Sequence, residues 1–267
     1  MISVIKADLR KHWRRPAFRV GAALVALLVA VNYGIGLAEL IWPSIAPQSG
    51  VDVDILYPAN FVNNATGAAG LSSAIAMIVG ALMAGSDYSW GTLKTALTQR
   101  AGRLTTVAGR IAAYLLYTAL LALIILAMGV AGSVVVATYQ SHPISWPAAI
   151  DIAKGFGALW LVLSVSGTLG IALGTLFRQP AAAVGAGLIY GLALQVLIVR
   201  FIAGINDGQL KWLANLFEGE NSQALTRSFG GAATGDITPE RAVLVLLAYV
   251  AIYVAATAAL VRQRDAT

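Results

Sequence analysis

Residues 86–103 read SDYSWGTLKTALTQRAGR, and they join two strongly apolar segments, Gly67–Gly85 and Thr106–Thr138. Three apolar side chains in this stretch recur at helical spacing and therefore share one face: Trp90, Leu93 and Leu97. A basic loop between two membrane spans normally faces the cytoplasm. The sequence thus predicts a short amphipathic helix on the cytoplasmic surface, with an apolar face that a soluble partner can bind. The alternative is that its Lys and Arg residues are only topology signals.

The same stretch resembles the pattern E-[FY]-x-x-G-T-[LW]-[KR]-x-L-[LT]-x-x-P-x-S-R of ABC-2 type transporter permeases. The matching residues are Asp87-Tyr88, Gly91-Thr92-Leu93-Lys94, Leu97 and Arg103. In those permeases the pattern follows the second span and forms the coupling helix against the ATPase. The resemblance implies an ATPase-coupling role for these positions: Asp87, Trp90, Gly91, Thr92, Leu93, Lys94, Leu97 and Arg103.

The chain departs from that pattern in three places. Asp87 stands where Glu is usual and keeps the charge, Gly102 stands where Ser is usual, and Ala101 or a neighbour replaces the usual Pro. Without the Pro, the sequence does not define the residue at which the predicted helix ends. Asp87 is expected either to cap the start of the helix or to pair with Arg103.

The composition indicates a membrane protein. Of 267 residues, 58% are hydrophobic and 11% are charged, whereas soluble domains have about 25% charged residues. The chain has no cysteine, which excludes disulfides, thiolate metal sites and cysteine nucleophiles. Its two histidines, His12 and His142, lie far apart in sequence, so no metal site is expected.

Residues 1–16 predict an interfacial helix on the cytoplasmic leaflet, because an apolar stripe runs between basic residues. The alternative is a loose basic tail. ABC-2 permeases typically begin with a helix of this kind, which helps to hold the ATPase. The residues singled out are Ile5, Leu9, Trp13 and Arg14.

The hydropathy pattern predicts an all-α membrane protein, with residues 1–267 forming a single transmembrane domain. The first span is expected to be an uncleaved anchor, since its apolar run is too long for a signal peptide. The segments 43–66 and 139–150 are expected to be external loops. Residues 204–239 are too apolar for a free loop, and the resemblance implies short re-entrant external helices there. Six spans are predicted: 17–42, 67–85, 106–138, 152–177, 181–199 and 242–261.

Thirteen of the 18 Lys and Arg residues fall in the segments that this topology places inside. Five fall outside: Lys154, Arg200, Lys211, Arg227 and Arg241. The bias predicts a multi-pass protein of the inner or plasma membrane, with both termini cytoplasmic and with Asp52 and Glu218 external. It also argues against nucleic-acid binding, although the net charge is +6, because the excess basic residues line the cytoplasmic leaflet.

No enzymatic motif is present. The nearest approach to a Walker A sequence, Gly91-Thr92-Leu93-Lys94-Thr95, lacks the glycines that cradle phosphate. The sequence also lacks H-E-x-x-H, G-x-S-x-G and paired carboxylates within a span. The chain is therefore not expected to be an enzyme, and ATP and Mg²⁺ are expected in a partner ATPase. Two GxxxG pairs, Gly170/Gly174 and Gly187/Gly191, hint at close helix packing.

The leading interpretation is the permease subunit of an ABC-2 type exporter of a hydrophobic or amphipathic substrate. Two such subunits would work with two ATPase subunits among membrane lipids. A secondary carrier or channel is the first alternative, disfavoured because no span carries a central ionisable residue. A non-transporting membrane scaffold is the second. Four polar residues are singled out as candidates for lining the pathway: Asn32, Tyr33, Tyr190 and Gln195. Each of them could instead bond to its own helix or lie at an interface.

Overall fold

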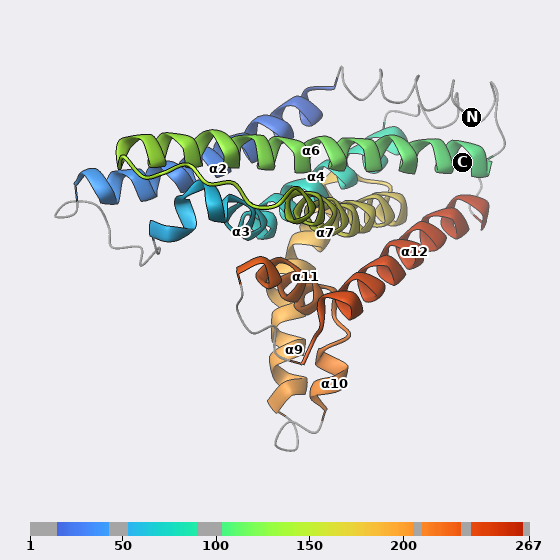
Figure 1. The fold of residues 1–267 in the computed structure, drawn as a ribbon. Coiled ribbons are helices and arrows are strands. Elements are labelled where there is room, and N and C mark those ends of the chain that lie inside the picture. The colour runs from blue at the N-terminus through green and yellow to red at the C-terminus, as the bar shows by residue number, and fades with distance from the viewer. Residues whose placement is uncertain (1–14, 43–52, 90–102, 205–209, 231–235, 264–267) are drawn as a thin grey trace.

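The computed structural model describes residues 15–42, 53–89, 103–204, 210–230 and 236–263, and within these residues every regular element is a helix (Figure 1). Six helical segments are long and apolar enough to cross a membrane, which confirms the prediction of an all-α membrane protein. They are α2 (Pro16–Ile41), α4 (Ala69–Ser89), α6 (Arg103–Tyr139), α7 (Ala149–Phe177), the continuous α8–η3–α9 segment (Pro180–Gly204) and α12 (Pro239–Gln263).

The boundaries follow from local chemistry. Proline stands at the start of three of the six segments, at Pro16, Pro180 and Pro239, where its missing N–H is not needed. The fifth segment is α8 (Pro180–Ile189), the π-helix η3 (Tyr190–Leu194) and α9 (Gln195–Gly204). With 37 residues, α6 is about 55 Å long, well beyond the roughly 30 Å of a bilayer core.

One expectation about the connections needs correction. The segment 43–66 was expected to be a loop, but its described part is mostly helical: η1 (Val53–Leu56), η2 (Pro58–Asn60) and the start of α3 (Phe61–Gly67). The chain between the last two spans does contain short helices, α10 (Lys211–Ala214), α11 (Glu218–Arg227) and η5 (Ser228–Gly230). Whether these helices enter the membrane stays a prediction.

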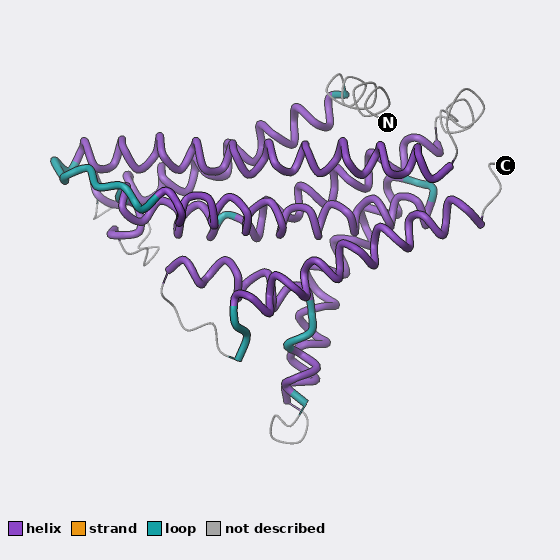
Figure 2. The backbone as a smooth tube through the Cα atoms, turned by 45° about the vertical axis from the view of Figure 1, so that its right-hand side comes forward, coloured by secondary structure: helices purple, strands orange, loops and turns teal. Residues whose placement is uncertain are grey.

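The helices α4 and α7 form the centre of the fold. The most apolar windows of α4 and α7 are 61% and 56% buried, whereas that of α12 is 11% buried. Figure 1 shows α6 and α2 running side by side, while α12 diverges and α9 leaves the bundle steeply with α10 beside it. The tube view of Figure 2 shows the same divergence of α12 from the main bundle.

Glycines bring α4 and α7 into backbone contact. A Cβ at Gly80 would collide with the carbonyl oxygen of Gly167, and one at Gly170 would collide with that of Met77. A Cβ at Gly174 would lie 2.8 Å from the Ala81 carbonyl oxygen. The Gly170/Gly174 pair is therefore a close-packing seam, as predicted.

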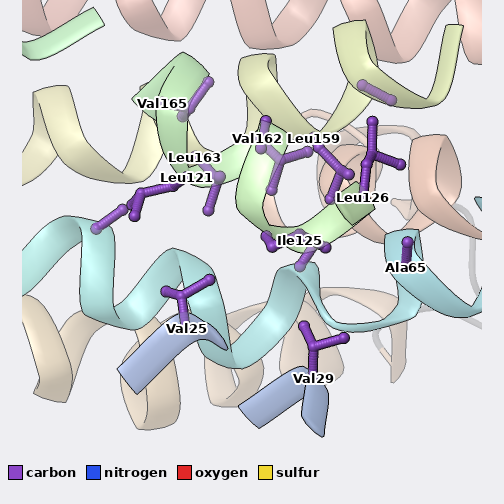
Figure 3. Close-up of a cluster of buried hydrophobic side chains, with 14 of the residues drawn as sticks. Val25, Val29, Ala65, Leu121, Ile125, Leu126, Leu159, Val162, Leu163 and Val165 are labelled. Atoms are coloured by element: carbon purple, nitrogen blue, oxygen red, sulfur yellow. The ribbon is translucent and has the colours of Figure 1, made fainter. Parts of the chain in front are cut away.

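The helices α2, α3, α6, α11 and α12 pack on this seam through an apolar core (Figure 3). Two tyrosines of α6 add hydrogen bonds to neighbouring backbones: the Tyr114 hydroxyl donates to the Ala76 carbonyl of α4, and the Tyr117 hydroxyl donates to the Phe18 carbonyl of α2 at 3.1 Å. The core side chains labelled in Figure 3 are Val25, Val29, Ala65, Leu121, Ile125, Leu126, Leu159, Val162, Leu163 and Val165.

The seam predicts a difference between two glycines of the same helix. Gly170→Ala places a methyl group against the α4 backbone, so we expect it to destabilise the protein by about 1–3 kcal/mol. Gly157→Ala, where a Cβ meets no atom within 4 Å, should be neutral or slightly stabilising because alanine favours helix. Thermal unfolding in one detergent measures both, and equal unfolding temperatures for the two variants would contradict the seam.

Candidate functional site

The last turn of α4 carries the first residues of the stretch that resembles a coupling motif. The second span was expected to end at Gly85, but α4 continues to Ser89, so Ser86, Asp87 and Tyr88 are helical. Asp87 is 2% exposed. A buried carboxylate is stable only where cations and donors compensate it, and the structure supplies both.

Two arginines hold the two oxygens of this carboxylate. Arg15 Nη2 lies 2.7 Å from Asp87 Oδ1, and Arg110 Nη2 lies 2.6 Å from Oδ2. Arg15 Nη1 also donates to Ser86 Oγ at 3.0 Å. Arg15 directly precedes α2 and Arg110 lies near the start of α6, so one carboxylate joins three segments that are far apart in sequence.

A third arginine approaches the same turn of α4. Arg178 ends α7 in the left-handed conformation, with φ of 55°, and its guanidinium lies 5.8 Å from the ring centroid of Tyr88. This places the cation over an aromatic ring, an attractive arrangement. The turn fits closely because Gly85 has no side chain: a Cβ there would lie 2.8 Å from Pro180 N. The α7–α8 turn therefore also rests on the end of α4.

We call Arg15, Asp87 and Arg110 the arginine clasp. Asp87 and Arg110 are buried and Arg15 is partly buried, so these charges lie mostly out of water. Removing one member of a buried ion pair leaves the others uncompensated, which is far more costly than losing a surface salt bridge. The clasp therefore transmits displacement: any movement of the end of α4 must carry along the start of α2 and the start of α6, or break these bonds.

The other predicted coupling residues cannot be placed in this geometry. Asp87 lies within a helix and so is not the N-cap of a following helix. Its described partners are Arg15 and Arg110. Pairing of Asp87 with Arg103 stays a prediction, because the Arg103 side chain lies outside the described part of the structure. Also outside the described residues are Trp90, Gly91, Thr92, Leu93, Lys94, Leu97, Ile5, Leu9, Trp13 and Arg14.

The four residues predicted to line a pathway fall in two places. Asn32 is exposed on α2, and Tyr33 is buried on the same helix, where it packs on Gly132 of α6. Tyr190 begins the π-helix, and Gln195 follows it and lines a cavity beside α11. Neither Asn32 nor Tyr33 lines that cavity.

Sequence reasoning missed Arg110 and Glu218. Arg110 was counted only as a topology signal, although an arginine inside a long apolar helix demands a buried partner, and that demand was the available signal. Glu218 was singled out only as an external residue, which stays a prediction; the structure shows that it is buried, and the Tyr253 hydroxyl donates to its Oε2 at 2.5 Å. No local pattern announces this contact, because Tyr253 lies in α12.

Comparison with known protein families places the chain in a family without an assigned function. A family model described as "Protein of unknown function (DUF2705)" matches residues 46–267. The matched region includes Asp87 and Arg110 and lacks Arg15. No curated protein matches the chain.

The clasp predicts that Asp87→Asn destabilises the protein by about 3–5 kcal/mol, because the buried guanidinium of Arg110 and the partly buried one of Arg15 lose their carboxylate. Asp151→Asn, at a partly exposed position in the first turn of α7, is the matched control and should be silent. Thermal unfolding measures both.

Arg110→Gln should destabilise as well, and the double variant with Asp87→Asn should lose less than the two single losses combined, since the two groups act as one unit. Additive losses would show that the two residues do not form a buried pair in the membrane.

Proposed function

The chain belongs to the DUF2705 family, and we propose that it is the membrane subunit of an ABC-2 type transporter. In this role it provides the path of the substrate across the membrane, while a separate ATPase subunit supplies the energy. The single observation behind the proposal is the position of the arginine clasp. Its carboxylate, Asp87, is the first residue of the stretch that resembles the coupling motif of those permeases.

The clasp suits a coupling role. The segment that would contact an ATPase begins directly after α4, and Arg15 lies near the end of residues 1–16, which are expected to form the interfacial helix. A push on either segment would reach α4 and α6 through charge-assisted bonds, one buried and one partly buried, which are short and directional. ATP and Mg²⁺ would be bound by two ATPase subunits, since the chain has no Walker A sequence.

The proposed orientation places this end of the bundle in the cytoplasm. Figure 1 shows the start of α2, the end of α4, the start of α6 and the end of α12 toward the same side. Basic residues near these ends include Arg15, Arg19, Arg110 and Arg262. The basic bias therefore favours a cytoplasmic location for both termini in the inner or plasma membrane.

We further propose that two membrane subunits, identical or similar, enclose the pathway and export a hydrophobic or amphipathic substrate. The first and fifth spans support this arrangement, because the most apolar windows of α2 and of α8–η3–α9 are 28% and 17% buried. Such surfaces are free to contact lipid or a second copy.

The coupling hypothesis predicts that Trp90→Ala and Leu93→Ala weaken ATPase binding. Truncating a central apolar anchor of an interface often costs about 2 kcal/mol or more. Co-purification of the ATPase and stimulation of its hydrolysis measure the effect, and Leu116→Ala, at an exposed position on α6, is the control. Normal co-purification and normal transport in both Trp90→Ala and Leu93→Ala would contradict this role and favour a carrier, channel or scaffold.

The topology prediction uses single cysteines and an impermeant maleimide on intact cells. Cysteines at Asp52 and Asp236 should be labelled, and a cysteine at Lys94 should be labelled only after the membrane is opened. Asp236 replaces Glu218 as the external probe because it is exposed, whereas Glu218 is buried. Labelling at Lys94 but not at Asp52 would reverse the orientation.

A further inference from the structure

A second polar cluster lies away from the arginine clasp, around the π-helix of the fifth span. Gln195 is the first residue after this π-helix and the only buried residue of α9, at 6% exposure. Its apolar neighbours face outward: Leu194, Val196 and Leu197 are all exposed. The helix thus turns its amide inward and its apolar side chains outward, the reverse of a soluble helix. π-Turns of this kind are frequent at functional sites.

The buried amide of Gln195 has a nitrogen that needs an acceptor. Among the described residues, none accepts a hydrogen bond from Gln195 Nε2. The amide lies against α11, where a Cβ on Gly219 would come within 2.6 Å of that nitrogen. An unpaired buried amide is costly unless something completes it.

The buried carboxyl of Glu218 lines the same cavity as this amide. Its Oε2 accepts the hydrogen bond from Tyr253, while none of the described residues donates to Oε1. Tyr190 and Tyr249 lie within electrostatic range of the carboxyl. Burial raises the pKa of Glu218 above its ordinary value, and the hydrogen bond from Tyr253 opposes this by favouring the ionised form.

Both groups line one cavity of about 390 Å³, within the range of small-molecule sites. The part near α11 is polar, with Ser222 and Gln223 beside Glu218 and Gln195. The part between α4, α7 and α8 is apolar, with Met77, Leu169 and Leu188 among its walls. Glu218 is the only charged residue that lines this cavity in the described part of the chain.

We propose that this cavity binds an amphiphile whose head group carries a cationic amine and an oxygen acceptor and whose tail is apolar. The amine pairs with Glu218 Oε1, the oxygen accepts from Gln195 Nε2, and the tail lies between α4, α7 and α8. A cation in this position completes the charge of the carboxylate, and an oxygen completes the amide. Taking this molecule as the transported substrate rests on the proposed function, whereas its binding does not.

The test uses the full chain in nanodiscs of phosphatidylcholine, with a photoactivatable sphingosine as probe, since sphingosine joins a long alkyl chain to an amino alcohol. Peptide mapping should place the cross-links on α4, α7 or α8 at the cavity walls. Glu218→Gln should weaken labelling by about ten-fold or more, because a charge-assisted bond is lost. Glu220→Gln, in the same helix but not lining the cavity, should leave labelling unchanged.

Competition on the unaltered protein gives an answer that no folding defect can obscure. Dodecylamine should displace the probe at least about ten-fold more effectively than dodecanol, because only the amine pairs with the carboxylate. Equal displacement by the two, or full labelling of a folded Glu218→Gln variant, would overturn the proposal. Gln195→Leu removes the amide, leaves the carboxylate in place, and should also weaken labelling. Unchanged labelling of this variant would show that the amide does not contact the ligand.

A further arm identifies the source of the ligand. Phosphatidylethanolamine in the nanodisc carries the same amine and oxygen chemistry, so displacement of the probe by this lipid would identify a bilayer lipid as the occupant. Labelling that survives the lipid would identify a single-chain amphiphile. Because no ATPase is present, loss of binding would leave the coupling proposal intact, and failure of ATPase binding would leave this site intact.

Discussion

The burial of one carboxylate constrains the whole bundle. Asp87 lies in the last turn of α4 with almost no exposure, and a charge in that position is stable only with close cations. Arg15 and Arg110 supply them from two other segments, so the start of α2 and the start of α6 must lie at the depth of the end of α4. The three helices are thereby fixed in register along their axes, which apolar packing alone does not achieve because it is non-directional.

The glycine seam and the arginine clasp fix different aspects of how the helices are placed: the distance between them and their axial position. At the seam, Gly80 and Gly170 bring the backbones of α4 and α7 into contact and set the distance between them. At the clasp, directional bonds set the axial position of α4 relative to α2 and α6. Since apolar burial adds little between helices in lipid, close packing and polar bonds are the forces available there. Helix α4 uses both, with close packing at the seam and polar bonds at the clasp.

The six spans were predictable because hydropathy over about 20 residues is a local signal. The predicted second span ended at Gly85, before the end of α4, because hydropathy assigns Ser86 and Asp87 to water. In the structure, arginines distant in sequence pair with the Asp87 carboxylate. The short helix α3 was missed because so few residues are helical only when packed. The hydrogen bond of Glu218 to Tyr253 joins α11 to α12, two elements that no single window of sequence contains. Of the site, the sequence therefore indicated Asp87 and Gln195 but not their surroundings.

The two polar sites share one helix. The cavity is lined by the first turns of α4, from Ala69 to Met77, and Asp87 lies near its other end. At 1.5 Å per residue, Ala69 and Asp87 are separated by about 27 Å along the axis. A helix is stiff along this axis, so an axial shift of α4 that strains the clasp also moves the wall of the cavity against α7. The glycine seam lies between the two sites and has no interlocking side chains at Gly80 and Gly170, which is the geometry of small shear movements between packed helices. In this arrangement an axial shift of α4 would alter the shape of the cavity without any unfolding of the helices between the two sites.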